Sequence, residues 1–193
     1  MRIAISGTHC CGKSTLIDEF LRAHPDYVHE PEPYTVLQED YGEAFAGEPC
    51  AEDFYRQLEF NAGRLRHYAF GECVIFERGP VDFLAYMLAL KDLRRDEDAL
   101  RVVDASLDMV TNAILFLDVI VFLPASGVSS SEISDSEDPK LRSAVDSRLV
   151  AILTDDDFGL FGAERPLVVE ATGTTAQRLQ TLEGALRIPA TGN

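Results

Sequence analysis

The chain carries the phosphate-binding pattern G-x-x-x-x-G-K-[ST] near its start, in the run Gly7-Thr8-His9-Cys10-Cys11-Gly12-Lys13-Ser14. A short apolar segment, residues 2–6, precedes this run, and residues 15–23 have the composition of a helix. The motif requires this order of strand, loop and helix. A loop whose backbone N–H groups point inward, backed by a helix N-terminus, can hold the negative oxygens of a triphosphate. The run therefore predicts a nucleotide-binding loop.

The polar side chains of this loop predict ATP and Mg²⁺ as its ligands. Lys13 is expected to place its ammonium group beside the β- and γ-phosphates. The hydroxyl of Ser14 is expected to coordinate Mg²⁺, a hard ion that prefers oxygen ligands. Thr15 adds a second hydroxyl, expected at the α-phosphate. The chain contains no Asn-Lys-x-Asp guanine signature, which favours ATP over GTP.

Acidic residues follow two further predicted strands. Glu30 comes after the short segment 27–29, and the buried run 73–76 leads directly into Glu77-Arg78. Ligands of parallel sheets collect beyond the carboxyl ends of the strands, so these residues are expected beside the phosphate loop. Glu30 is then a candidate base, Glu77 a candidate Mg²⁺ ligand, and Arg78 a candidate to neutralise a phosphoryl oxygen. A strand-end salt bridge is the alternative for Glu77 and Arg78.

Apolar runs separated by helical patterns predict an α/β fold. Strands are expected at residues 2–6, 27–29, 73–76, 118–124 and 166–170, with helices between them. This order predicts a three-layer structure built on a parallel five-stranded sheet with right-handed crossovers. With 193 residues, 46% of them hydrophobic, the chain is long enough for one well-buried domain, expected to span residues 1–193.

A serine-rich, acidic stretch begins at residue 125 and ends at Asp138. Its composition predicts an exposed loop, and the helix expected from Pro139 carries Arg142 and Arg148. A flexible segment followed by arginines is the arrangement of a lid that closes over a transferring phosphate. We therefore expect a lid at about residues 125–148. A solvated linker followed by ordinary helix charges is the alternative.

The charge of the chain excludes some partners. A net charge of −16 would repel DNA and RNA, whereas a few local donors can still hold a small phosphorylated ligand. No apolar run is long enough to span a bilayer, and the first predicted strand leaves no room for a signal peptide. A cytoplasmic protein without a membrane partner is expected.

The long apolar helix at 99–117 could support a homodimer as easily as a core.

Together the motifs resemble the nucleoside and nucleotide kinase branch of the P-loop nucleoside triphosphate hydrolase fold, and more closely the small "AAA-domain" ATPase/kinase proteins. The resemblance rests on residues 7–15, Glu30-Pro31, residues 77–82 and residues 138–142. Deoxynucleoside kinases carry a Glu-Pro pair whose glutamate takes the acceptor proton, and a Glu-Arg pair that serves metal and phosphates. The resemblance assigns these roles to Glu30, Glu77 and Arg78.

The expected function is an ATP-Mg-dependent phosphotransferase acting on a small acceptor, with nucleosides and nucleotides favoured. Lys13, Arg78 and either Arg142 or Arg148 would stabilise the transferred group. Lids of this kind usually carry an early arginine, whereas residues 127–137 are mainly serine and acid. This departure motivates an alternative, a nucleotide-dependent switch or slow ATPase that acts with a protein partner. A kinase of a non-nucleotide metabolite shares every motif, and the sequence does not name the acceptor.

Overall fold

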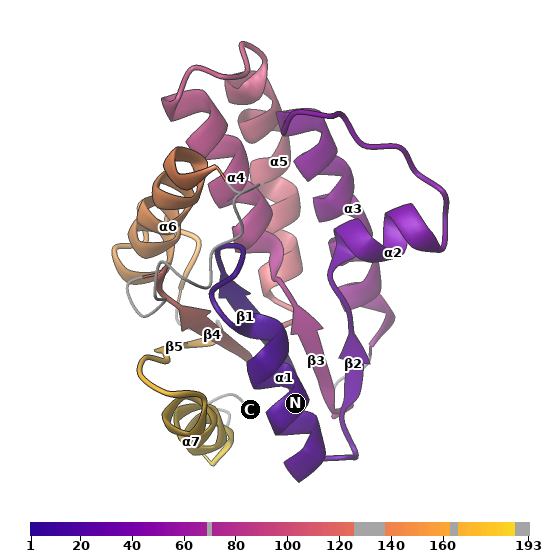
Figure 1. Cartoon of the computed structure of the whole chain (residues 1–193), viewed down its shortest axis with the longest axis vertical. Coiled ribbons are helices and arrows are strands. Elements are labelled where there is room, and N and C mark those ends of the chain that lie inside the picture. Colours follow the sequence, from indigo (N-terminus) through magenta and orange to yellow (C-terminus); the bar gives the residue numbers. More distant parts are fainter. Residues whose placement is uncertain (69–70, 126–137, 163–165, 188–193) are drawn as a thin grey trace.

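A parallel five-stranded sheet organises the molecule, with helices on both of its faces (Figure 1). The computed structural model describes residues 1–68, 71–125, 138–162 and 166–187. The strands lie in the order β2-β3-β1-β4-β5, and all neighbours are parallel. Their bounds are β1 Arg2–Gly7, β2 Val28–Glu30, β3 Val74–Glu77, β4 Val119–Leu123 and β5 Leu167–Glu170. The predicted three-layer α/β fold is confirmed.

The three inner strands are buried along their whole length, whereas the two edge strands are partly exposed. Continuous apolar runs are what a strand covered on both faces requires. In the register of the sheet, Ile5 of β1 lies opposite Glu77 of β3, and Gly7 lies opposite Leu123 of β4. The end of β3 therefore lies beside the phosphate loop that follows β1.

The helices divide into two layers (Figure 1). Their bounds are α1 Lys13–Ala23, α2 Pro33–Glu39, α3 Ala51–His67, α4 Pro80–Asp92, α5 Ala99–Ile114, α6 Pro139–Thr154 and α7 Thr175–Leu186. Helices α1 and α7 cover one face of the sheet and share a hydrophobic cluster with it. Helices α3 to α6 pack into the larger cluster on the other face.

Helix α4 lies at the centre of the larger layer, and every residue from Pro80 to Leu90 is buried. It packs against α3, α5 and α6. The apolar face of α5 packs into this same cluster, with Leu100 and Leu115 left about half exposed. Because α4 starts directly after Arg78-Gly79, its rigid position sets where the residues that follow β3 lie.

The predicted lid is described only in part. Residues 126–137 lie outside the described residues, while the expected helix from Pro139 is present as α6. The side chain of Asp138 caps this helix by accepting hydrogen bonds from the backbone N–H groups of Lys140 and Leu141. Within the described ranges, no helix combines the length and the apolar character that crossing a membrane requires.

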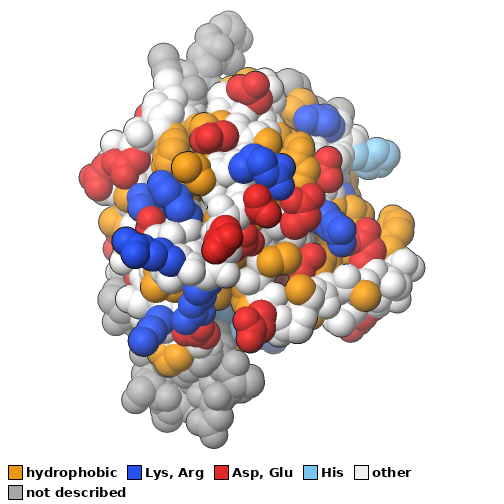
Figure 2. Space-filling model, turned by 90° about the horizontal axis from the view of Figure 1, so that it is seen from above, with side chains coloured by type: hydrophobic (Ala, Val, Ile, Leu, Met, Phe, Trp, Pro, Cys, Tyr) orange, Lys and Arg blue, Asp and Glu red, His pale blue; other side chains and the backbone are white. Residues whose placement is uncertain are grey.

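Charged side chains of both signs are mixed on the face shown in Figure 2. On that face, Lys and Arg are scattered among Asp and Glu and do not gather into one basic patch. A polyanion binds through clustered Lys and Arg that neutralise its phosphates. This face offers no such cluster, in keeping with the net charge of −16.

Candidate functional site

The phosphate loop leaves β1 at the carboxyl edge of the sheet and ends where α1 begins, at Lys13. A Cβ on Gly7 would lie 2.6 Å from the sulfur of Cys11 and 2.7 Å from the carbonyl oxygen of Leu123, so only glycine fits there. The ammonium group of Lys13 is buried and donates a hydrogen bond to the carbonyl of Thr8 at 2.8 Å. This hydrogen bond ties the side chain at the end of the loop to the backbone at its start.

A cavity of about 520 Å³ opens on the loop. Its lining consists of residues 9–15, Glu32, Glu77, residues 173–175 and Arg178. Gly7 and Thr8 of the predicted loop are buried and are not part of this lining. The cavity therefore joins the phosphate loop, the ends of β2 and β3, and the start of α7.

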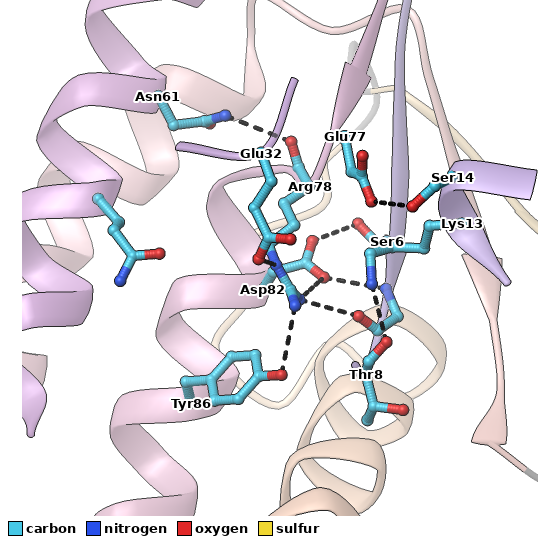
Figure 3. A network of polar contacts seen from close by, with 12 residues as sticks. Ser6, Thr8, Lys13, Ser14, Glu32, Asn61, Glu77, Arg78, Asp82 and Tyr86 are labelled. Carbon is cyan, nitrogen blue, oxygen red and sulfur yellow. Dashed lines mark hydrogen bonds and ion pairs between the residues drawn. The ribbon is translucent and has the colours of Figure 1, made fainter. Parts of the chain in front are cut away.

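Ser14 and Glu77 meet at the edge of this cavity. The hydroxyl of Ser14 donates a hydrogen bond to Oε1 of Glu77 at 2.8 Å (Figure 3). Glu77 is the last residue of β3 and only 8% exposed. A hydroxyl and a carboxylate side by side are hard oxygen donors, and they fit a Mg²⁺ ion that keeps most of its other positions for water and phosphate. The structure thus brings the two predicted metal ligands together.

Arg78 is the most constrained residue of the site. Its backbone has a positive φ of 74°, and its side chain is buried. The guanidinium donates to Oε1 of Glu32 at 2.5 Å, to the carbonyl of Gly7 at 3.0 Å and to the hydroxyl of Tyr86 at 3.4 Å (Figure 3). Burial disfavours its charge, but Glu32, Tyr86 and Asp82 outweigh burial and raise the pKa of Arg78. Arg78 is therefore a fixed cation beside the loop.

Asp82 supports the loop from below. It is fully buried and accepts hydrogen bonds from the hydroxyl of Ser6 at 2.6 Å and the backbone N–H of Gly7 at 2.9 Å. It also accepts from the N–H of Gly79 at 2.9 Å, at the start of α4. Asp82 therefore caps α4 and joins this helix to the phosphate loop.

The structure places Glu30, the predicted base, outside both cavities described here. Its carboxylate accepts a hydrogen bond from Arg64 at 2.8 Å and another from the hydroxyl of Tyr68. Both partners belong to α3 or the residue after it. Glu30 is thus not brought together with Lys13 or the loop, and its role as a base is a prediction that the geometry does not support.

Glu32, two residues further on, lines the cavity of the loop and a second cavity beside it. Burial would raise the pKa of its carboxyl group, but the guanidinium of Arg78 and the ammonium of Lys13 lower it to about 2. Glu32 is not among the site residues predicted from the sequence. A signal was present, because Glu32-Pro33 repeats the Glu-Pro pair that was assigned to Glu30-Pro31.

The second cavity has a volume of about 500 Å³ and aromatic walls. The rings of Phe54 and Tyr86 stack at 4.5 Å between centroids, and those of Tyr34 and Phe45 at 4.8 Å. The rest of its lining is His9, Glu32, Thr35, Ala46, Gly47, Pro49, Cys50, Asp53, Gln57, Arg78 and Phe83. A cavity of this size and character suits a small, flat organic molecule. It shares His9 and Glu32 with the cavity of the loop.

The two predicted lid arginines lie in different surroundings. Arg148 forms two hydrogen bonds with Asp92, at 2.6 and 2.7 Å. Asp92 ends α4, whose 13 residues place it about 18 Å from the start of that helix. Nε and Nη2 of Arg142 are buried and have no hydrogen-bond partner among the described residues. Neither arginine lines the two cavities described here.

Two polar residues of the cavities have no sequence motif that could have revealed them. Arg178 of α7 lines the cavity of the loop, and Gln57 of α3, only 4% exposed, lines the aromatic one. Both are brought to the site by helices far along the chain from the loop. Only the folded structure can show these contacts.

The chain is similar to known proteins in sequence and in fold. A family model described as "AAA domain" matches residues 2–178. A search of curated proteins gave no match. Among solved structures, deoxyadenosine kinase from M. mycoides with dCMP and dCDP bound is similar with a TM-score of 0.65 and 18% identity, over 96% of this chain and 98% of that one.

The same kinase with dATP bound is similar with a TM-score of 0.61 and 18% identity, again over 96% and 98% of the two chains. The NadR protein in complex with NAD and AMP-PNP is similar with a TM-score of 0.63 and 14% identity, over all of this chain and 50% of that one. At such identities the likeness shows the fold, which is that of the P-loop nucleoside kinases. With the family model matching nearly its whole length, this chain belongs to the AAA domain family.

Proposed function

We propose that this protein is an ATP-dependent kinase that transfers the γ-phosphate of ATP to a hydroxyl group of a nucleoside-like acceptor. One observation carries the proposal: a phosphate-loop cavity and an aromatic cavity meet at Glu32 and His9. A phosphoryl donor and a flat acceptor would then face each other across a carboxylate. Positioning of this kind supplies most of the catalysis in phosphoryl transfer.

The donor side uses the phosphate loop with Lys13 at the β- and γ-phosphates. Ser14 and Glu77 would hold Mg²⁺, directly or through its waters. The ion, bound with ATP, would neutralise charge on the phosphates. Arg78 is a fixed guanidinium beside the loop and would face the transferred group, since it already bonds the carbonyl of Gly7 at 3.0 Å.

The acceptor side favours an uncharged hydroxyl over a phosphate. The aromatic cavity is lined by two carboxylates, Glu32 and Asp53, and its guanidinium, from Arg78, is already bound to Glu32. An acceptor phosphate would meet these carboxylates without an unpaired guanidinium in the lining to offset them. The aromatic walls suit a base, and the buried amide of Gln57 offers a polar contact for it. The nucleotides named for the similar structures support a nucleoside-like acceptor.

Glu32 would orient the acceptor hydroxyl and take its proton. The pKa of about 2 keeps this carboxylate ionised at neutral pH, so it can accept a hydrogen bond from the hydroxyl. In a loose transition state the charge develops mainly on the transferred phosphoryl group, so orientation matters more than the strength of the base. Arg142, whose guanidinium is not held by a described carboxylate, is the lid arginine that we assign to the transferred group.

The proposal is tested by ATP turnover with Mg²⁺ and a matched set of acceptors. Each nucleoside is compared with its own 5′-monophosphate and with ribose, while ADP release and labelled product are followed together. We expect ADP release to depend on the nucleoside, with a phosphorylated nucleoside as product, and the monophosphate to be at least tenfold poorer. Equal use of the monophosphate would contradict the hydroxyl acceptor.

A nucleotide-dependent switch or slow ATPase is the second candidate. One observation favours it: the bidentate contact with Asp92 holds Arg148 away from both described cavities, leaving fewer cations for the transferred phosphate. The same assay separates the two functions. Tight ATP binding with slow ADP release that no acceptor accelerates would replace the kinase by the switch.

A further inference from the structure

Arg178 attaches helix α7 to the phosphate loop. It lies in the first turns of α7 and is only 7% exposed. Its Nη1 donates a hydrogen bond to the carbonyl of Cys11 at 2.7 Å, across 167 residues of sequence. The contact fixes the guanidinium directly against the loop, on the face of the sheet that α1 and α7 cover (Figure 1).

Gly12 shows how close this approach is. A Cβ at position 12 would lie 3.0 Å from Nη1 of Arg178, and the backbone there has a φ of +92°. The left-handed conformation favours glycine at this position, and a Cβ there would crowd the guanidinium packed on it. The arginine and the loop form one packed unit.

The guanidinium of Arg178 keeps an unpaired donor within the described part of the chain. Its Nε is buried, and among the described residues it has no hydrogen-bond partner, nor does any carboxylate form an ion pair with the guanidinium. Arg78, by contrast, is held by Glu32 at 2.5 Å. An arginine stays charged in proteins, and leaving a buried donor unpaired is unfavourable. The charged guanidinium of Arg178, in the wall of the phosphate-loop cavity, is therefore suited to bind an anion.

The position of Arg178 indicates which part of the donor it meets. Glu32 and Glu77 mark the transfer end of the cavity, where the γ-phosphate is placed by the proposed function. Arg178 enters beside residues 173–175, from the helix layer opposite to α4. The N-terminus of α7 opens on this same side of the cavity, and its orientation also favours negative charge.

We propose that Arg178 binds the α-phosphate of the donor nucleotide, at the end of the phosphate chain opposite to Lys13 and Glu77. This inference rests on the proposed ATP site. Residues 127–137 of the expected lid contain no Lys or Arg, and Arg178 of α7 would supply a positive charge to the donor phosphates instead. Because the α-phosphate changes little during transfer, Arg178 contributes to binding of the donor and only slightly to the chemical step.

The test measures the affinity of the full-length chain for ADP and for ATP, by calorimetry with Mg²⁺. R178Q loses the charge, and its shorter side chain ends at the position of Nε, two bonds short of the atom that bonds the carbonyl of Cys11. We expect it to bind both nucleotides about 10- to 30-fold more weakly, as for a hydrogen bond to a charged group. The matched control is R187Q, which removes the same charge from an exposed position at the end of α7. It should stay within twofold of the wild type.

Kinetics add a readout that a merely structural brace would not share. R178Q should raise KM for ATP about tenfold while kcat changes less than threefold. A brace alone would make R178Q less stable to heat without nucleotide but leave its KM and its affinity for both nucleotides within twofold of the wild type; that result would overturn the inference. Loss of affinity for ATP but not for ADP would also overturn it, since the contact would then be at the γ-phosphate.

Thermal unfolding without nucleotide checks that each variant is folded. If R178Q is not folded, R178K decides the question, because one ammonium group cannot reach both the carbonyl and a phosphate. Three- to tenfold weaker binding of both nucleotides by R178K would uphold the inference, and unchanged binding would overturn it. A wild-type chain that binds neither nucleotide would instead overturn the proposed donor site itself.

Discussion

Glu30 and Glu32 lie two residues apart, yet they belong to different parts of the molecule. Glu30 is paired with Arg64 at 2.8 Å and lies outside both cavities. Glu32 is paired with Arg78 at 2.5 Å and lines both. Each glutamate precedes a proline and each has an arginine as partner, Arg64 with a side chain 12% exposed and Arg78 buried. The comparison teaches that the place of the arginine partner in the fold, rather than the Glu-Pro motif, decides which carboxylate reaches the cavities.

The path of the chain explains the separation. Strand β2 ends at Glu30, and helix α2 begins at Pro33, so Glu32 stands at the turn between them. Residues that are two apart in a strand point to the same side. Here the strand has ended, and the turn carries Glu32 over the edge of the sheet toward Arg78.

The largest effect is expected from Glu32→Gln. It removes the carboxylate that would orient the acceptor hydroxyl, so kcat should fall about 100-fold or more. The Kd for ATP, measured by calorimetry, should change less than threefold, because Lys13 and the loop hold the donor. A variant with kcat within threefold of the wild type would remove Glu32 from the proposed mechanism.

Glu30→Gln is the matched control for Glu32→Gln, and it should lower the stability of the protein rather than its turnover. The change leaves Arg64 of α3 without its carboxylate partner and weakens the contact of Tyr68. We expect the free energy of unfolding in urea to fall by about 1–3 kcal/mol. Turnover of the folded variant should stay within threefold. A loss of kcat as large as that of Glu32→Gln, with unchanged stability, would return the role of base to Glu30.

A smaller, pH-dependent effect tests the charge pair of Glu32 directly. Its pKa is lowered from the ordinary value of 4.5 to about 2, as the positive charges of Arg78 and Lys13 outweigh burial. A lowered carboxyl pKa stabilises the fold above pH 4.5, and this contribution is lost as the pH falls toward 2. The difference in unfolding free energy between wild type and Glu32→Gln should therefore shrink between pH 6 and pH 3. A constant difference would show that packing, not charge, accounts for it.

The features that the sequence predicts are those encoded in short, continuous stretches. The phosphate loop occupies eight adjacent residues, and Glu77 directly follows an apolar run that must be a buried strand. Parallel pairing of β1 with β3 then brings Glu77 to Ser14, as predicted. The five strands could be found for the same reason, because burial on both faces leaves an uninterrupted apolar signature.

The features that the sequence does not predict depend on contacts between distant segments. The bond from Arg178 to Cys11 spans 167 residues, and that from Arg148 to Asp92 spans 56. Spacing rules cannot reveal them, because an arginine on a helix face has the same local pattern whether it meets solvent, a carboxylate or a ligand. The sequence does not separate Glu30 from Glu32 for a related reason, since their arginine partners come from α3 and from the residue that follows β3.

The smallest effect is expected from Arg148→Gln. Like Glu30, Arg148 is paired with an oppositely charged side chain outside both cavities. Arg148 and Asp92 are 29% and 34% exposed, and a pair of this kind contributes about 1 kcal/mol or less. Thermal unfolding should shift by only a few degrees. Turnover with the best acceptor should be unchanged, because Asp92 holds this arginine about 18 Å from the start of α4. A tenfold loss of turnover would mean that Arg148 leaves Asp92 during the reaction. Arg148 would then belong to the active site, as proposed for Glu32, although it lies outside both cavities in this structure.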